Sequence, residues 1–465
     1  MADQLAAPQL KMYNPDSQIK TPNLDALAAR SVQFDSAYCP SPPLRPFTHV
    51  SHHGPLAHED WGGYHTALAG KMHFIGDQLH GYETRLTSDI YPGDFGWAVN
   101  WDDPERRLEW YHNASSILQA GTCVRSNQLD YDEEVMYKSQ QFLYNHIREG
   151  PDKRPFCMTV SLTHPHDPYT IEEKYWDLYE GVDIDLPKVK IPKEQQDAHS
   201  KRLMKVTDIW DEDFTDEQIK RAKRAYYGAV SYVDDCIGRL LDTLKRCRLD
   251  KNTIVVFSGD HGDMLGERGL WYKMSYFESS VRVPLLFSYP QKFQPHRVTQ
   301  NVSTLDILPT LCDLSAYDDP SWSLEVHHLP TDPPQLFNLE RDPLELVNLA
   351  NLVNKEEPLS AEEEEAKLKF TKFEAEARSR WDFDAITKDV LLSQRKRRVV
   401  WDALKIGRFE SWDFDPATHE EGTAKYIRSF LPLDDLERKA RYPPVDKYGH
   451  ETNGLIANQA GSHGE

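Results

Sequence analysis

Three features are scarce or missing in this sequence, and each absence excludes a class of protein. No apolar run approaches the ~18–20 residues of a membrane-spanning helix, and no signal-peptide pattern opens the chain. The six cysteines are scattered without a Cys-x-x-Cys pair, which indicates reduced thiols. Acidic residues outnumber basic ones, 75 to 54, and the net charge of −21 argues against partners such as nucleic acid or an anionic membrane. We therefore expect a cytoplasmic protein that binds neither.

What the sequence does contain is the material for a large core. Apolar residues make up 39 % of the 465 residues, which is typical of a globular chain and not of a disordered one. Apolar positions recur at helical spacing over residues 216–246, and a β-branched strand over residues 254–257 follows after a short turn. A helix that leads into a buried strand is typical of a parallel sheet covered by helices, so we predict an α/β fold.

The loop after the strand at residues 254–257 carries the most informative side chains. Asp260 and His261 stand side by side just past its end, and Lys273 follows twelve residues later. Open α/β sheets place their ligands outside the carboxyl ends of strands, so these residues are candidates for a metal site with a nearby cation. Taken alone, the Asp-His pair is equally compatible with a polar loop that caps a helix.

A family resemblance is carried by residues 260–273, whose sequence is Asp-His-Gly-Asp-Met-Leu-Gly-Glu-Arg-Gly-Leu-Trp-Tyr-Lys. It resembles the sulfatase branch of the alkaline-phosphatase-like superfamily, and within it the choline sulfatases and phosphonate hydrolases. The resemblance implies a mostly parallel central sheet between helices over residues 1–320. It also implies a smaller C-terminal α+β part with an aromatic tail over residues 321–465, and a homo-oligomer formed through that tail.

The same resemblance implies a metal site. It assigns Asp260 and His261 as ligands, and the opening Met-Ala-Asp-Gln adds Asp3, a residue that would otherwise indicate a solvated terminus. The expected cofactor is one divalent cation, Ca²⁺ for oxygen-rich ligation, with Mn²⁺ or Mg²⁺ as alternatives. The implied reaction is hydrolysis of a small-molecule sulfate ester, choline O-sulfate, to choline and sulfate. Cations would offset the charge on the transferring sulfuryl group. The alternative function is hydrolysis of a phosphonate or phosphate monoester, because hydrolases of that kind belong to the same superfamily.

Two further motifs resemble the family's sulfate pocket. Gly-Lys-x-His at residues 70–73 supplies Lys71 and His73, which we expect at a strand end and on one side of it. Pro-His-x-Pro at residues 165–168 supplies His166. Together with Lys273, these three residues form the expected catalytic set.

Three residues are candidates for contact with the substrate. His164 stands two positions before His166 and is the alternative candidate for the same role. Trp97 and Trp101 lie in a stretch whose sequence resembles that of choline sulfatases. Aromatic faces bind quaternary ammonium groups with roughly 0.5–2 kcal/mol per contact. Packing in the core is an equally good reading of both tryptophans.

The sequence departs from the family where the nucleophile belongs. Type I sulfatases carry Cys-x-Pro-Ser-Arg, whose cysteine becomes formylglycine, but the Ser-Pro-Pro-Leu stretch here places Leu44 at that position. Leucine cannot act as a nucleophile, and Cys39 lacks the Pro-Ser-Arg context. The chain is also too short for the family near residues 43–63 and again near 315–330. We therefore predict internal deletions, or a wrongly assigned splice site, and keep a catalytically inactive sulfatase-like protein as a third reading.

Overall fold

The computed structural model describes residues 1–40, 63–74, 79, 81–90, 112–150, 153–314, 334–354 and 358–382, with parts of 384–399 and of 441–451. Leu44, Trp97 and Trp101 lie outside the described residues. The strands are β1 (Val32–Tyr38), β2 (His65–Gly70), β3 (Thr84–Arg85), β4 (Gly121–Cys123), β5 (Phe156–Ser161), β6 (Thr170–Glu172), β7 (Val255–Ser258), β8 (Arg282–Val283), β9 (Leu285–Ser288) and β10 (His296–Ser303). The main helices are α1 (Pro22–Ala28), α3 (Ser115–Leu118), α4 (Asn127–Arg148), α5 (Glu173–Trp176), α6 (Ala198–Val206), α7 (Asp216–Arg246), α8 (Glu278–Val281), α9 (Ile307–Leu314) and α10 (Ala361–Arg380).

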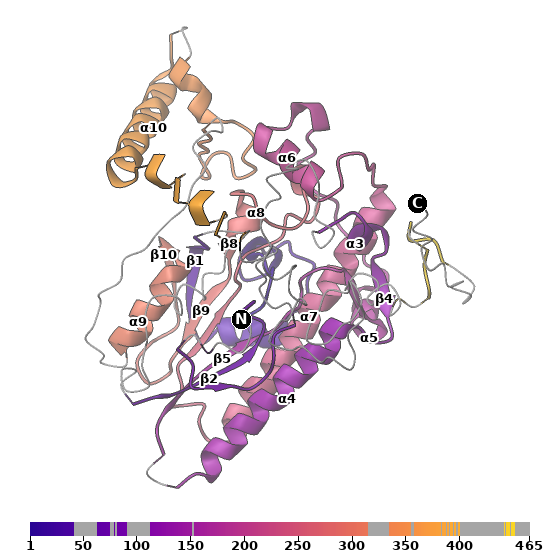
Figure 1. The fold of residues 1–465 in the computed structure, drawn as a ribbon, viewed down its shortest axis with the longest axis vertical. Coiled ribbons are helices and arrows are strands. Elements are labelled where there is room, and N and C mark those ends of the chain that lie inside the picture. Colours follow the sequence, from indigo (N-terminus) through magenta and orange to yellow (C-terminus); the bar gives the residue numbers. More distant parts are fainter. Residues whose placement is uncertain are drawn as a thin grey trace.

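The central sheet consists of two parts that the first residues of the chain join. One part has the strand order β10-β1-β9-β7, and the other has the order β3-β2-β5 (Figure 1). Ala2 forms parallel bridges with Leu162 beyond β5 and with Gly259 beyond β7. The neighbours β1–β10, β2–β3 and β2–β5 are parallel, while β9 is antiparallel to β1 and β7. The predicted, mostly parallel α/β sheet is confirmed, with β8 and β9 as antiparallel exceptions among the described strands.

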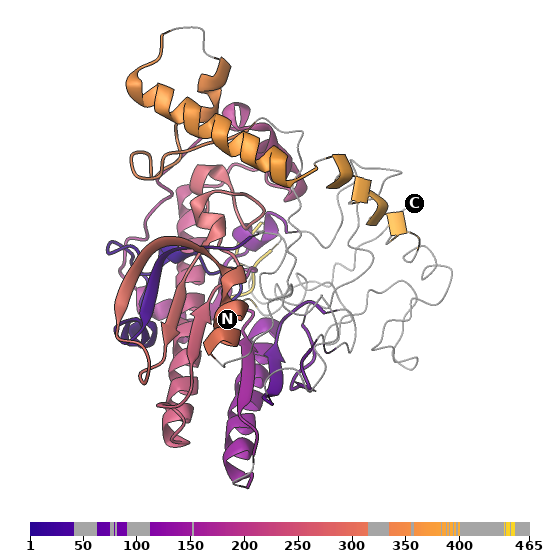
Figure 2. The ribbon, with the colours of Figure 1, turned by 90° about the vertical axis from the view of Figure 1, so that its left-hand side faces the viewer.

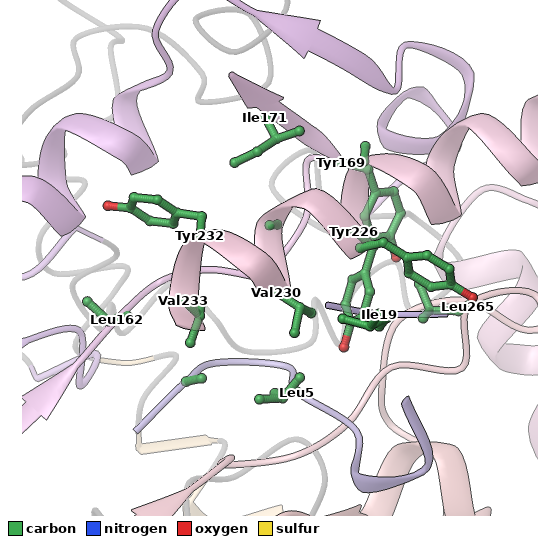
Figure 3. Packing of buried hydrophobic residues seen from close by; sticks show 14 of the residues in the cluster. Leu5, Ile19, Leu162, Tyr169, Ile171, Tyr226, Val230, Tyr232, Val233 and Leu265 are labelled. Atoms are coloured by element: carbon green, nitrogen blue, oxygen red, sulfur yellow. The ribbon is translucent and has the colours of Figure 1, made fainter. Parts of the chain in front are cut away.

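Helices cover the sheet and build the main core. Helix α7 begins at a capping box on Thr215 and has the bounds that the apolar spacing predicts. Its buried side includes Tyr226, Val230 and Val233, which pack toward Leu5 near the start of the chain (Figure 3). A second cluster packs the strands β1, β8 and β9 against α9. The core therefore fixes the first residues of the chain from the helix side as well as from the sheet.

The C-terminal part is organised differently. The charged helix α10 begins at a capping box on Ser360 and buries no residue. It stands clear of the central sheet in both views and packs on the 3₁₀ helix η6 (Leu349–Asn354) (Figures 1 and 2). In the part of the chain that the structure describes, no helix combines the length and apolar character needed to cross a bilayer.

Candidate active site

The first residues of the chain are held as firmly as an inner strand. The Ala2 N–H donates to the Ser258 carbonyl at 3.1 Å, and the Asp3 N–H donates to the Leu162 carbonyl at 3.2 Å. Asp3 is consequently only 2 % exposed, although it stands near the start of the sequence. The two flanking strands both point their carboxyl ends at it, so its side chain reaches the loop that follows β7.

Asp3, Asp260 and His261 come together at this point. One ligand atom from each lies within 4.8 Å of the others. His261 Nε2 is 3.5 Å from Asp3 Oδ1 and 3.5 Å from Asp260 Oδ2. The backbone supports the group as well, since Asp260 Oδ1 accepts the N–H groups of Gln4 at 2.9 Å and of His261 at 2.8 Å. Two carboxylates and one imidazole converge, as a small divalent cation site requires.

The donor atoms of this group fit a divalent cation. Asp3 Oδ1 is buried and accepts no hydrogen bond from any described residue, while its other oxygen is paired with Lys71. Burial and then the adjacent Asp3 carboxylate raise the pKa of Asp260 to about 7. Burial would also raise the pKa of Asp3, but Lys71, Lys273 and His261 outweigh it and keep that pKa below its usual range. The pocket thus holds buried carboxylate oxygens that a cation would satisfy.

Lys71 and His73 are delivered by a tight turn and not by a strand. Strand β2 ends at Gly70, and His73 has a left-handed φ of 52°, so the expected alternation along a strand does not apply. Asp89, which is fully buried, clamps this turn. Its Oδ2 accepts the N–H groups of Met72 at 3.0 Å and Phe74 at 3.1 Å, one on each side of His73. Lys71 reaches the metal group by its contact with Asp3.

His166 and Lys273 form the second half of the site. Lys273 Nζ donates to His166 Nε2 at 2.8 Å, and His166 Nδ1 lies 2.6 Å from its acceptor, the Asp167 carbonyl. These contacts assign the proton of the neutral imidazole to Nδ1. Burial, followed by the charge of Lys273, holds the pKa of His166 well below its usual range. Burial likewise lowers the pKa of Lys273, whose charge also acts on Asp3 and Asp260.

His164 is placed elsewhere. Its Nδ1 lies 2.7 Å from Asp132 Oδ2, and its ring packs edge-on against Tyr232 of α7. Asp132 also accepts the backbone N–H groups of Thr163 and His164. His164 therefore contacts α4 and α7, whereas His166 contacts Lys273. Of the two histidines in the motif, the structure brings only His166 to the other predicted residues.

Gln4, which the opening motif predicts as a neighbour of the metal, connects the two halves of the site, and sequence reasoning missed the carboxylates that it joins. Gln4 Nε2 donates to Asp263 Oδ2 at 2.7 Å and to Asp167 Oδ1 at 3.2 Å. Asp167 Oδ2 lies 2.9 Å from His112 Nδ1, and the His112 ring stacks on Tyr272 at 4.6 Å. Asp167 and Asp263 stand inside the quoted motifs, so proximity to those motifs was the available signal. No pattern in the sequence indicates His112.

His112, His166 and Asp167 form a second group whose spacing would suit a metal. In this group, however, His166 Nε2 already accepts from the Lys273 ammonium, and Asp167 Oδ2 is engaged by His112. Those two ligand atoms are therefore already engaged, whereas Asp3 Oδ1 is buried and accepts no hydrogen bond from any described residue, so the Asp3–Asp260–His261 group is the better candidate.

The architecture and the paired cations beside a carboxylate–histidine group define an alkaline-phosphatase-like hydrolase. Residues 61–317 match the Sulfatase family model, and residues 388–442 match the model described as Choline sulfatase enzyme C terminal. The chain therefore belongs to the sulfatase family, the sulfuric ester hydrolases. The choline-sulfatase of Rhizobium meliloti (strain 1021) is 39 % identical over 510 aligned residues, which cover 95 % of this chain and 97 % of the relative.

More distant relatives agree on the family and the fold. The arylsulfatase of Clostridium perfringens (strain 13 / Type A) is 29 % identical, over 76 % of this chain and 89 % of its own. The phosphonate monoester hydrolase of Agrobacterium radiobacter superposes with a TM-score of 0.57 at 20 % identity, covering 82 % of this chain and 94 % of that structure. The alignment with the Rhizobium enzyme spans 510 residues, more than the 465 of this chain, so that relative contains residues with no counterpart here.

Proposed function

We propose that the protein binds choline O-sulfate at the Asp3–Asp260–His261 group, which would hold one divalent cation, Ca²⁺, and hydrolyses it to choline and sulfate, with water supplying the oxygen that sulfur gains and the proton that choline gains. The observation that carries the proposal is the convergence of this ligand set with Lys71 and Lys273 at the ends of β5 and β7. The 39 % identity to a choline-sulfatase along nearly its whole length supports the choice of ester. A cation held by these ligands would stabilise negative charge on the sulfuryl oxygens.

The lysines and histidines have distinct roles in this proposal. Lys71 and Lys273 approach the metal group with their ammonium groups and would pair with sulfate oxygens as charge develops there. His166 stays neutral, with Nε2 facing Lys273, so the pair holds a proton beside the site. That proton can pass to the oxygen of the departing choline, which would otherwise leave as an alkoxide. His73 lies in the turn that Asp89 clamps and would contribute its imidazole to sulfate binding.

The sequence at Leu44 favours a second candidate function. A leucine in the place of the formylglycine cysteine leaves the site able to hold a cation and a sulfate ester but without the nucleophile that attacks sulfur. On this reading the chain binds choline O-sulfate without turnover. The surplus of residues in the Rhizobium alignment supports the prediction that segments of the family are absent here.

Two measurements on the purified protein with Ca²⁺ separate these readings. Calorimetric titration with choline O-sulfate reports binding, and ion chromatography of released sulfate reports hydrolysis. Binding with sulfate release supports the enzyme, whereas binding without release supports the inactive reading. Neither binding nor release would refute both, and faster turnover of a phosphonate monoester would favour that substrate class. A Lys273→Met variant, which lacks the ammonium group, is the matched control for binding at the proposed site.

Sequencing the transcript across codons 38–66 tests whether the nucleophile segment is absent from the natural protein or only from this sequence. Additional codons that encode Cys-x-Pro-Ser-Arg would restore the catalytic reading for the natural protein. A transcript that encodes Ser41 to Gly63 as printed would favour binding alone.

A further inference from the structure

The described part of residues 441–451 lies on the turn at residues 118–123. Arg441 forms an antiparallel bridge with Cys123, and Val445 pairs with Glu451 to make a small hairpin. Arg441 is 6 % exposed and Val445 is 3 % exposed, so the hairpin is packed onto the body of the protein. The two segments are more than 300 residues apart in the sequence.

The Arg441 guanidinium recognises the backbone of this turn. Its Nε donates to the Gln119 carbonyl at 2.9 Å, and its Nη1 donates to the Thr122 carbonyl at 2.7 Å. The guanidinium also occupies the space beside Gly121, where an added Cβ would lie 2.3 Å from Nη2. A planar fork that bonds two carbonyls and fills the place of a side chain specifies the shape of the turn.

The other end of the hairpin lies equally close to the backbone at Leu118. A Cβ added at Gly449 would lie 1.8 Å from the Leu118 carbonyl oxygen, and the same oxygen accepts from the Arg221 side chain of α7. The hairpin and α7 together therefore hold the carbonyl groups at the end of α3. Glycine at position 449 is required because any side chain would prevent this contact.

The clamped turn supports the half of the active site that carries His166. The Gly121 N–H donates to the Tyr169 carbonyl at 2.9 Å, which ties the turn to the loop after β5. Ser116 Oγ in α3 donates to Asp167 Oδ2 at 3.3 Å. The Asn113 carbonyl, just before α3, accepts from Tyr272 OH at 2.6 Å. Displacement of the turn would thus shift the neighbours of His166 in two ways, through the Gly121–Tyr169 hydrogen bond and through the Ser116–Asp167 hydrogen bond.

We propose that Arg441 is a positioning residue of the active site, and that docking of residues 441–451 on residues 118–123 fixes the corner that holds His112 and Asp167. The docking itself is independent of the substrate, whereas its effect on ester binding rests on the proposed function. Arg441 lies within residues 388–442, the segment that matches the C-terminal choline-sulfatase family. Through Arg441, this segment would contribute to the geometry of the site.

Hydrogen–deuterium exchange of the full-length chain tests the docking. In Arg441→Met, which keeps the apolar stem and removes the fork, amides of residues 112–123 and 167–172 should exchange about tenfold faster or more, because two charge-assisted hydrogen bonds are lost. Exchange in α10 and β10 should not change. The exchange rates of Arg441→Lys should lie between those of the wild type and those of Arg441→Met, since one ammonium cannot bond both carbonyls in the same geometry. Arg378→Met, on the exposed face of α10, is the control and should match the wild type.

Unchanged exchange at residues 112–123 in Arg441→Met would overturn the proposal, and so would a uniform rise along the whole chain. Calorimetry then tests the consequence for the site. Arg441→Met should weaken choline O-sulfate binding several-fold, with a smaller effect on inorganic sulfate, which needs only the cation and the lysines. Equal weakening of both ligands would overturn the positioning role. If the wild type binds no choline O-sulfate, the proposed function fails while the exchange result still decides the docking.

Discussion

The Asp89 clamp allows a quantitative prediction about the turn that carries Lys71 and His73. Asp89→Ala removes the acceptor of two buried backbone N–H groups, and each unsatisfied donor costs ~1–3 kcal/mol, so we expect a loss of about 2–6 kcal/mol in the free energy of unfolding. Asp89→Asn keeps one acceptor oxygen and loses only the charge assistance. Its cost should be about 1–2 kcal/mol.

The assay is urea unfolding at pH 7 with near-constant m-values across the variants. Asp16→Ala provides the control, because Asp16 is exposed and its removal should stay within about 0.5 kcal/mol. The Asn variant, which remains folded, should also bind inorganic sulfate more weakly, since the left-handed turn at His73 loses its support. A cost below about 1 kcal/mol for Asp89→Ala would refute the clamp. Equal costs for the Ala and Asn variants would show that the hydrogen bonds are not its basis.

Three other predictions concern the cation, a buried carboxyl and a glycine. Ca²⁺ at about 100 times its Kd should stabilise the wild type by about 2.7 kcal/mol, and Asp3→Asn should lose this gain in a thermal-shift assay. Burial raises the pKa of Glu345 from its usual 4.5 to about 7, so the folded state holds a proton that the unfolded state releases. The wild type should therefore lose stability relative to Glu345→Gln as pH rises from about 4.5 to about 7, by no more than about 3 kcal/mol, and not further above that range. Gly70→Ala should cost at least about 2 kcal/mol, because φ is +114° and a Cβ would lie 1.9 Å from the Ser161 carbonyl oxygen.

Each of these predictions has a matched control. Asp16→Asn should keep the full Ca²⁺ response, and a response retained by Asp3→Asn would place the cation elsewhere. A stability difference between Glu345→Gln and the wild type that does not vary with pH would contradict the raised pKa. Gly181→Ala tests the glycine argument, since its φ is +72° but nothing lies within 4 Å of the added Cβ. If it costs as much as Gly70→Ala, backbone conformation alone explains the loss.

Regular periodicity made part of the fold predictable. The apolar spacing over residues 216–246 gave both ends of α7, and the β-branched run at 254–257 is β7 with a shift of one residue. These segments are predictable because one helix or strand buries one continuous face. The antiparallel course of β9 was not predictable, since a four-residue apolar strand has the same pattern in either direction.

The site was predictable only where its residues are close in sequence or belong to a quoted motif. Asp260 and His261 are adjacent, and the resemblance supplied Asp3. His112 could not be found because its contact with Asp167 spans 55 residues and follows no repeat. The turn at His73 contradicted the strand argument because β2 stops at a glycine that must approach the Ser161 backbone closely. Tertiary contacts, and not local propensity, decide these positions.

The bridges of Ala2 to Leu162 and Gly259 also determine when the site can form during synthesis. Asp3 is made well before the strands that position it, which are complete only after residue 258. Contacts of such sequence separation carry a large loop-closure entropy and slow the folding of a chain. Asp3 therefore lacks its strand neighbours until the residues of β5 and β7 have been made. We infer that cation binding is among the last events of folding, and that the ion stabilises the finished sheet without guiding its early assembly.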